Sequence, residues 1–432
     1  MKKNWGSKLN FVLLAIIVCV VLFENEPYDY STNHLPIDSG DTAWMIVASA
    51  FVLLMTPGLA FFYGGMVNIK NIISTMLQSF VALGVISVVW VFIGFSLSFG
   101  DSIYGIIGSP LTYLNFKNVT LAPHPEFGST IPFLIFAFFQ LKFAVITPAL
   151  ISGSFAERIR FRSYILFMLL FTLFIYSPLA HMTWHPEGLL RKWGVIDFAG
   201  GTVVHMSAGL AALAGALFLG KRKKTEGKPA NIPFVILGTG LLWFGWFGFN
   251  AGSALGANFD AVVAFANTNL ASATSMITWI FFDRFRDGKM SAIGACIGAI
   301  VGLVAITPAA GVVTLGQSIF IGFIAAIISN LAIGIFHNLN VDDTLDVFPT
   351  HGIGGIVGMI LTSVFAANVG LVYGEYKTFV MHLAAILIVG AYTLGMSYIL
   401  FKIVDLITPL RVREDQELRG LDASQHGENF SS

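Results

Sequence analysis

Long apolar segments separated by short polar links recur along most of this chain, and they constrain its fold more than any single motif does. The chain is 56% hydrophobic and 11% charged, with a mean hydropathy of +0.79, which is not the composition of a soluble domain of 432 residues. A membrane-spanning helix needs about 20 mainly apolar residues. The sequence therefore predicts an all-α integral membrane protein with eleven transmembrane helices. The predicted spans are 43–65, 72–99, 131–152, 160–180, 200–219, 232–250, 259–282, 290–307, 312–336, 350–367 and 378–404.

The first 25 residues form a separate pattern. Lys2, Lys3 and Lys8 precede an apolar run, Phe11–Phe23, whose thirteen residues are too few to span a bilayer. This arrangement is typical of a secretory signal peptide, although small residues for a cleavage site are poorly represented. We interpret residues 1–25 as a signal peptide, and a retained short anchor is the alternative.

The basic residues of the links fall into two unequal sets, which predict the orientation. The richer set is Lys70, Arg158, Arg160, Arg162, Lys221, Arg222, Lys223, Lys224, Lys228, Arg284, Arg286 and Lys289, and the poorer set is Lys117, Arg191, Lys192 and Lys377. Because cytoplasmic links carry the excess of Lys and Arg, the richer set belongs in the cytoplasm. We expect a multi-pass protein of the plasma (inner) membrane, with the mature N-terminus outside and the C-terminus in the cytoplasm.

The first ten predicted helices divide into two halves of five, and an odd number of spans per half inverts the second half. Each half ends in a helix with one histidine after an aspartate: Asp197 and His205, then Asp346 and His351. The two spacings differ, so the repeat is weakly marked in the sequence. Inverted repeats place their site near the midplane, at the interface of the repeats, where the two histidines would meet.

The stretch Asp197–Met206 opens one of the apolar segments. Asp197 occupies a helix N-cap position, where its charge suits the positive end of the helix dipole, and His205 follows two turns further in. An ionisable group inside a transmembrane helix marks a substrate or proton path by default. The structural alternative is a histidine hydrogen-bonded to a neighbouring helix.

Other charged residues have simpler interpretations. We expect Asp346 to cap a helix, and Asp342 and Asp343 to lie in a solvated loop. The adjacent Glu157 and Arg158 are predicted to be structural, at the cytoplasmic interface.

Aromatic residues cluster in two predicted helices and one link. Phe139 and Phe143 share a helix face at spacing i, i+4. Trp246 stands in a dense aromatic run, and Trp184 lies in an outer link. Each is a candidate for lining a site, while the usual role of such residues is lipid contact or anchoring at the membrane interface.

Several function classes are excluded. The formal net charge is zero, so a nucleic-acid partner is not indicated. The two cysteines, Cys19 and Cys296, form no metal-ligand spacing, and the many glycines form no phosphate-binding loop. No nucleophile or carboxylate motif accompanies the histidines, which argues against an intramembrane hydrolase. The sequence predicts no catalytic residues, no metal and no cofactor.

Five segments carry a resemblance to a known family. They are Met55–Met66, Phe155–Phe161, Asp197–His205, Gly245–Ala254 and Thr350–Gly355. With these motifs the chain strongly resembles the ammonium transporter family, which groups ammonium transporters, methylammonium permeases and Rhesus-type proteins, and it is most similar to the bacterial or archaeal type. The resemblance implies a transmembrane domain over residues 41–405, a homotrimer, and one pore per subunit. It also implies two inverted five-helix repeats followed by a final helix.

The resemblance implies roles for individual residues. The family's twin pore histidines correspond to His205 and His351, and the stacked phenylalanines that close the outer end of the pore correspond to Phe143 and Phe249. The external recruitment site corresponds to Trp184 and Ser253, with Asp197 beneath it. Ser253 favours the ammonium branch over the Rhesus branch. Lys142 is not part of the pore motif; a rotation of about 100° from Phe143 leaves it to meet a partner or to snorkel.

These assignments lead to a mechanistic hypothesis. Aromatic faces and the Ser253 hydroxyl would select ammonium, which loses its proton near the phenylalanines and crosses as ammonia. The histidines would then solvate ammonia or relay the proton. Methylammonium is a further candidate substrate. A Rhesus-like neutral ammonia channel and an ammonium sensor without significant flux are the alternatives.

Residues 406–432 have no apolar run long enough for a domain, and by charge they form a solvated cytoplasmic tail. The tail resembles the regulatory tail of bacterial family members, which contacts the pores from inside. The resemblance therefore implies regulation by a nitrogen-sensing PII protein of GlnK type at the cytoplasmic face.

Overall fold

The computed structural model describes residues 36–223, 228–339 and 341–430, with residues 12, 14–16 and 19 before them. Nearly all of the predicted signal peptide, residues 1–25, lies outside these residues, so it stays a prediction. Among the described residues, nine helical segments are long and apolar enough to cross a membrane. They are Ser39–Met66, Ile69–Phe99, Phe133–Phe155, Phe161–Lys192, Gly201–Leu219, Ile232–Gly252, Leu315–Asn338, Phe348–Phe365 and Tyr376–Ile407.

Two further predicted spans are helical but fall short of these nine. Helix α11 (Phe259–Asp287) is long enough but less apolar, and α12 (Ala292–Ile306) is apolar but has only 15 residues. Every segment predicted to span the membrane thus contains a helix, while the number of crossings stays a prediction.

The remaining elements follow the same order along the chain. The longer helices are α2 (Ser39–Met66), α3 (Ile72–Val89), α5 (Phe133–Ile151), α6 (Phe161–Phe171), α7 (Ser177–Trp184), α9 (Ser207–Leu219), α10 (Ile232–Gly252), α13 (Leu315–Asn338), α14 (Gly354–Phe365) and α15 (Tyr376–Ile407). Short helices are α4 (Phe95–Phe99), α8 (Leu189–Lys192) and α16 (Glu414–Arg419), and π-helical turns are η3 (Trp90–Gly94), η6 (Thr172–Tyr176), η7 (Gly201–Met206), η8 (Phe348–Ile353) and η10 (Asp422–His426). Four 3-10 turns complete the helical elements: η2 (Ile69–Asn71), η4 (Leu114–Phe116), η5 (Ser152–Phe155) and η9 (Leu371–Tyr373).

Polar residues in the links set where the helices begin. Asn231, Asn258 and Ser291 accept backbone N–H groups at the starts of α10, α11 and α12. Thr314 and Gln317 form a reciprocal capping box on α13. Such caps satisfy N–H groups that a helix start leaves unpaired, which fixes helix ends within an apolar sequence.

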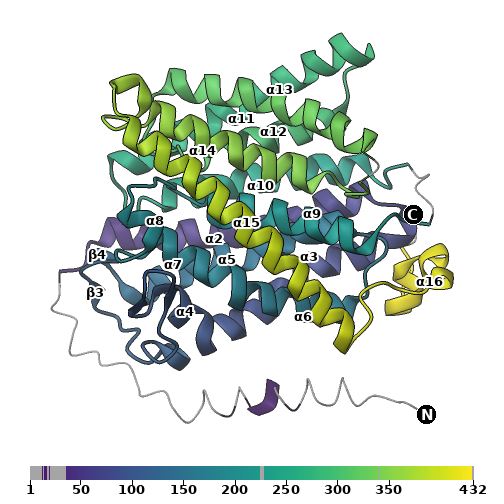
Figure 1. The fold of residues 1–432 in the computed structure, drawn as a ribbon, viewed down its shortest axis with the longest axis horizontal. Helices are drawn as coiled ribbons and strands as arrows, with labels where there is room; N and C mark the ends of the chain where they lie inside the picture. The colour runs from purple at the N-terminus through teal and green to yellow at the C-terminus, as the bar shows by residue number, and fades with distance from the viewer. Residues whose placement is uncertain are drawn as a thin grey trace.

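The two ends of the helical bundle differ. One end, here called the hairpin end, carries α8 and two short antiparallel hairpins (Figure 1). These hairpins pair β1 (Ser102–Ile103) with β2 (Ile107–Gly108) and β3 (Pro123–His124) with β4 (Gly128–Pro132). The other end, here called the tail end, carries α16 and η10. The sequence did not predict the hairpins, because three of the four strands have only two residues, too few for a strand pattern.

Helix α15 runs diagonally across the other helices and spans both ends (Figure 1). Near the tail end, Phe401 of α15 stacks on Phe167 of α6 with ring centroids 4.0 Å apart. Near the hairpin end, His382 of α15 accepts the Ile196 backbone N–H at 2.9 Å through Nε2. The last helix therefore braces the loop that leads into η7.

The tail folds back onto the tail end of the bundle. The buried Asp422 carboxylate accepts the backbone N–H groups of Ile73 at 3.1 Å and Ser74 at 2.8 Å, at the start of α3. The Leu421 N–H donates to the Asn71 side chain. The tail is therefore anchored to the helices, whereas charge alone had predicted only a solvated segment.

Two predictions about acidic residues were wrong. Asp342 and Asp343 were expected in a solvated loop, but the Asp342 carboxylate accepts three N–H groups of Arg222, two from its side chain, and Asp343 is buried. Asp343 also performs the capping predicted for Asp346, because it accepts the Phe348 N–H of η8 at 2.7 Å. Asp346, with a φ of 53°, instead lies 2.9 Å from the His337 ring.

Arg222 joins three segments of the tail end. Its guanidinium lies 2.9 Å from Glu157 and 2.8 Å from Asp342, and all three side chains are at most 16% exposed. Arg158, the neighbour of Glu157, donates instead to the Thr344 hydroxyl and the Asp342 carbonyl. Glu157 and Arg158 therefore both have the predicted structural role, but each bonds to different partners and not to the other.

We expect Arg222→Met to destabilise the protein by about 3–5 kcal/mol, because two mostly buried carboxylates lose their partner. Thermal unfolding of detergent-solubilised protein measures the change. Arg413→Met is the matched control, since Arg413 pairs with Asp415 where both side chains are about two-thirds exposed, and it should change the midpoint far less.

The ion pair between Arg222 and Asp342 also predicts how the stability of the protein depends on pH. Burial alone raises the pKa of Asp342, but hydrogen bonds and charge from Arg222, with the charge of Arg158, lower it below its usual value. A carboxyl group with a lowered pKa in the fold stabilises it above the unfolded pKa, and this stabilisation disappears as the pH falls through the folded value. The difference in midpoint between wild type and Arg222→Met should therefore shrink below about pH 4. If the midpoints of wild type and Arg222→Met differed as much at pH 3 as at neutral pH, the stabilising role of the Arg222–Asp342 pair would be contradicted.

Candidate functional site

The structure brings the two predicted histidines together at the centre of the bundle. His205 lies in η7 and His351 in η8, and their Nδ1 atoms are 3.3 Å apart. The rings are nearly parallel, with centroids 5.4 Å apart, and the residues are only 1% and 3% exposed. The other nitrogen of His205, Nε2, is buried and has no hydrogen-bond partner among the described residues. One Nδ1 must donate to the other, so the contact requires at least one neutral ring.

Close backbone approach makes this meeting possible. Gly209 of α9 lies against Gly352 of η8, and a Cβ on Gly209 would overlap the Gly352 backbone nitrogen. A larger residue at position 209 would push the two segments apart. Glycine is therefore required here by the crossing of the two histidine-bearing segments.

Asp197 organises the start of η7. Its carboxylate accepts backbone N–H groups from Gly200 at 2.8 Å, Gly201 at 2.5 Å and Thr202 at 2.7 Å. It also accepts the Thr202 hydroxyl at 2.5 Å, and the residue is buried. The helix begins at Gly201 rather than next to Asp197, because Gly200 adopts φ 116° and turns the chain. Asp197 thus caps the helix from three residues further away than predicted.

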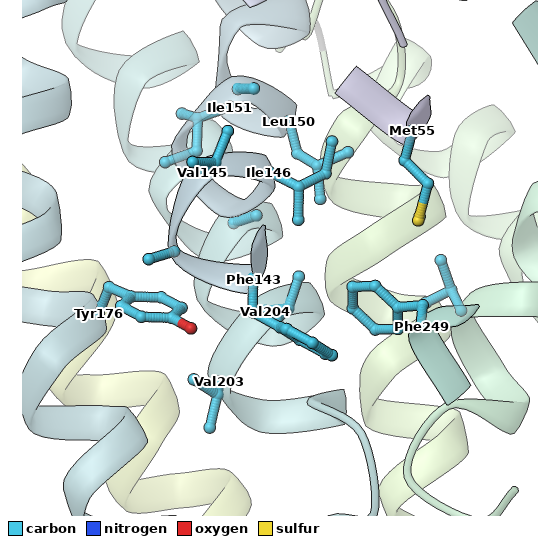
Figure 2. Close-up of a cluster of buried hydrophobic side chains, with 14 of the residues drawn as sticks. Met55, Phe143, Val145, Ile146, Leu150, Ile151, Tyr176, Val203, Val204 and Phe249 are labelled. Carbon is cyan, nitrogen blue, oxygen red and sulfur yellow. The ribbon is translucent and has the colours of Figure 1, made fainter. Parts of the chain in front are cut away.

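A compact aromatic group lies next to the histidines. The rings of Phe143 and Phe249 point toward one another from α5 and α10, with centroids 4.2 Å apart (Figure 2). Trp246 lies over His205 at 5.3 Å, and its Nε1 donates to the Thr307 hydroxyl at 2.9 Å. Phe139 contacts the Phe143 ring edge-on at 5.0 Å. Dense apolar packing therefore surrounds the approach to His205.

Trp184 and Ser253 lie toward the hairpin end of this group. The Trp184 ring meets Phe143 edge-on at 5.8 Å, and its Nε1 donates to the Asp197 carbonyl at 3.0 Å. The Ser253 hydroxyl donates to the Phe249 carbonyl at 2.9 Å, which leaves its oxygen lone pairs free to accept. The tryptophan NH thus fixes the ring, while the serine presents an acceptor.

A cavity of about 390 Å³ opens between these residues at the hairpin end. Phe143, Trp184, Asp197 and Ser253, all predicted from the sequence, line it. The sequence interpretation missed four polar residues of the same cavity: Gln140, Thr183, Glu126 and Arg191. Gln140 stands one turn before Phe143 on α5, so its position on that helix face was a usable signal.

Lys142 does not line the cavity. Its Nζ lies 5.7 Å from the Phe138 ring centroid, as in a cation–π contact. Within the described part of the chain, no group of three or more His, Cys, Asp or Glu side chains has a metal-binding arrangement.

Comparisons with known proteins identify the family of this chain. A sequence model described as the Ammonium Transporter Family matches residues 43–430. The chain is 47% identical over 399 residues to an ammonium transporter of Aquifex aeolicus, covering 91% of this chain and 93% of that protein. The chain belongs to the ammonium transporter family. Multiple apolar helices and this membership make it a multi-pass membrane protein.

Solved structures of the ammonium transporter family share the fold. The crystal structure of Mep2 from Saccharomyces cerevisiae has a TM-score of 0.83 and 36% identity, covering 89% of this chain and 90% of that chain. A structure of a Sensor Amt Protein has a TM-score of 0.82 and 30% identity, covering 89% of this chain and 98% of that chain.

For this family member, Asp197→Ala should lower the free energy of unfolding by at least about 3 kcal/mol, because three buried N–H groups lose their acceptor. Asp197→Asn should cost less, since one oxygen still accepts. Thermal unfolding in detergent measures both. Asp38→Ala is the control: Asp38 caps α2 through one exposed hydrogen bond to the Asp41 N–H, and its loss should cost about 1 kcal/mol. Equal changes in Asp197→Ala and Asp38→Ala would contradict the organising role of Asp197.

Proposed function

We propose that this protein is an ammonium transporter that recruits ammonium from outside, deprotonates it, and conducts ammonia past the His205–His351 pair. The observation that carries this proposal is the continuous order of groups from the cavity inward. Trp184, Ser253 and Phe143 line the cavity, and the Phe143 ring contacts that of Phe249. The paired histidines lie beyond Phe249, whose ring is 6.0 Å from that of His205. The 47% identity to an ammonium transporter of Aquifex aeolicus also supports this proposal.

Recruitment follows from the residue types of the cavity. The faces of Trp184 and Phe143 attract a cation by about 0.5–2 kcal/mol, depending on how far it is desolvated. Sodium and potassium would gain the same attraction. Only ammonium can also donate a directional hydrogen bond, and the Ser253 oxygen has lone pairs available for it.

The phenylalanine contact then favours neutral ammonia over ammonium. With ring centroids at 4.2 Å, Phe143 and Phe249 leave no polar partner for an ion that passes between them. Moving an isolated charge through apolar surroundings is far costlier than moving a neutral amine. The proton therefore leaves before or at this contact.

The histidines offer the next polar surface. His205 and His351 share one hydrogen bond through Nδ1, and the buried Nε2 of His205 has no partner among the described residues. A neutral His205 that donates through Nε2 can hydrogen-bond the ammonia lone pair, and one that accepts there can take an N–H. Both solvation of ammonia and relay of the proton are consistent with this pair, and methylammonium is a further substrate of the same chemistry.

The architecture extends the proposal. Asp197 precedes His205 by eight residues, and Asp343 precedes His351 by the same eight, each capping a six-residue π-helix. This matched pair supports two inverted five-helix repeats plus a final helix, eleven spans in all, with one pore per subunit of a homotrimer. Our sequence analysis paired Asp346 with His351 and so did not find this equal spacing.

Orientation and regulation are part of the same proposal. Lys70, Arg222 and Arg411 lie at the tail end, which supports a plasma-membrane protein with its C-terminus in the cytoplasm and its mature N-terminus outside. The anchored tail, residues 406–432, offers a surface for a PII protein of GlnK type.

One alternative is an ammonium sensor, favoured by the similarity to the Sensor Amt Protein. A Rhesus-like neutral ammonia channel is the other, and Ser253 in the cavity argues against it.

Ammonium-evoked current from protein in liposomes on a solid-supported membrane tests the proposal. Wild type should give a saturating current with ammonium and none with sodium. His351→Ala removes the Nδ1 partner of His205 and should abolish at least about nine-tenths of the current, because proton transfer through a positioned group contributes about 10²–10⁴-fold. His205→Asp keeps a titratable group and is the comparison.

Stopped-flow ammonia uptake in the same liposomes separates the alternatives. Ammonia flux without current would favour the neutral channel. Tight ammonium binding with neither flux nor current would favour the sensor, and either result would overturn the transport mechanism.

A further inference from the structure

Two side-chain oxygens on the cavity wall have no hydrogen-bond partner in the described part of the chain. The Oε1 atom of Gln140 and the Oγ1 atom of Thr183 are buried and make no hydrogen bond to the described residues. Gln140 is 9% exposed and Thr183 is 3% exposed, and both line the cavity that holds Trp184 and Ser253. More than nine-tenths of buried polar groups in native proteins are hydrogen-bonded, and an unpaired one costs about 1–3 kcal/mol. Both oxygens are therefore available to a molecule that enters the cavity.

Thr183 is one of three described threonines, with Thr75 and Thr393, whose buried hydroxyl has no hydrogen-bond partner among the described residues, and it is the one of the three that lines the cavity. In α5, the Thr147 hydroxyl donates to the Phe143 carbonyl at 2.7 Å, one turn back in its own helix. In η6, Thr172 donates in the same way to Met168 at 2.9 Å. This is the ordinary solution for a threonine in an apolar helix. Thr183 does not use it, so its hydroxyl is left for a partner from the cavity.

The two side chains are placed beside the recruitment residues but are not part of them. Gln140 lies three residues before Phe143 on α5, which puts it on the same face about 4.5 Å closer to the hairpin end. Thr183 directly precedes Trp184 on α7. Gln140, Thr183, Trp184 and Phe143 all line one cavity, so a molecule that bonds to Gln140 and Thr183 would lie beside the Trp184–Phe143 contact.

We propose that Gln140 and Thr183 form a second ammonium position in the cavity, which an ion occupies before it reaches Trp184 and Ser253. The proposal rests on the function proposed above. Both groups supply neutral oxygen acceptors, and an ammonium ion carries four N–H donors, so it can bond to both while it keeps part of its hydration shell. The cavity of about 390 Å³ has room for an ion and several waters. Glu126 and Arg191 both line the same cavity with opposite charges, so the neutral oxygen acceptors carry the argument for a cation with N–H donors.

Isosteric loss of each acceptor tests this position. Thr183→Val and Gln140→Met remove the oxygens with little change of volume, and Thr183→Ser keeps the hydroxyl. We expect each loss variant to raise the half-saturating ammonium concentration of the current about tenfold, the usual effect of one hydrogen bond to a charged donor. The maximal current should be unchanged, because the phenylalanines and histidines are untouched. Thr183→Ser should restore the wild-type value.

A second readout distinguishes binding from a structural role. The loss of an acceptor should reduce the rise of the thermal midpoint that ammonium induces, while the midpoint without ammonium is not lowered, because the oxygen removed has no partner among the described residues. A structural defect would lower the midpoint without ammonium. Thr147→Val is the matched control: it removes a hydroxyl of α5 that is bonded within the helix, and it should leave the half-saturating concentration and the ammonium-induced rise unchanged.

The outcomes are separable. Unchanged half-saturation in folded Thr183→Val and Gln140→Met would mean that the oxygens bind water only, which overturns the second position. If Gln140→Met does not fold, the Thr183→Val and Thr183→Ser pair decides the matter. If wild type carries no current, the transport function fails, and ammonium-induced shifts of the thermal midpoint in wild type and Thr183→Val still test the position. Equal shifts would then overturn it.

Discussion

The contact between His205 and His351 is the interaction on which the rest of the site depends. The two Nδ1 atoms are 3.3 Å apart and both residues are nearly excluded from solvent. Such a contact requires that two segments far apart in the sequence are held close together. Gly209 and Gly352 allow the approach, and buried carboxylates set the start of each segment. Asp197 holds the first turn of η7, and Asp343 holds that of η8. Polar groups within the apolar bundle thus position the two imidazoles that lie beyond Phe143 and Phe249 on the proposed path.

The helical fold was predictable because lipid imposes a simple rule. Each backbone polar group in the hydrocarbon must be paired within its own helix, so apolar runs of sufficient length become helices. The predicted segments 43–65 and 232–250 accordingly match α2 and α10 to within a few residues. Interfacial structure follows no such rule. The hairpins β1–β2 and β3–β4 are local but too short to leave a periodic pattern. The tail is anchored through Asp422 by hydrogen bonds to residues far away in the sequence, which leave no pattern either.

The candidate site was predictable to different degrees. Motif resemblance placed His205, His351, Phe143 and Phe249, which the structure brings together. The comparison of the two five-helix halves paired Asp346 with His351, but Asp343 and Asp346 both precede this histidine, and only the folded loop shows that Asp343 reaches the Phe348 N–H. Gln140 and Thr183 were missed for another reason: a residue becomes conspicuous for lacking a partner only once its neighbours are known.

In the proposed mechanism, both histidines are neutral and one proton lies between their Nδ1 atoms, so that the pair receives ammonia rather than ammonium. The ¹⁵N chemical shifts of the ring nitrogens of His205 and His351, measured in lipid bilayers at neutral pH and assigned with single-histidine variants, test it most directly. The claim predicts one protonated Nδ1, one unprotonated Nδ1, and no imidazolium signal from either ring. An imidazolium at His205 or His351 at neutral pH would contradict it, because a fixed positive charge at the pair would oppose the path proposed here.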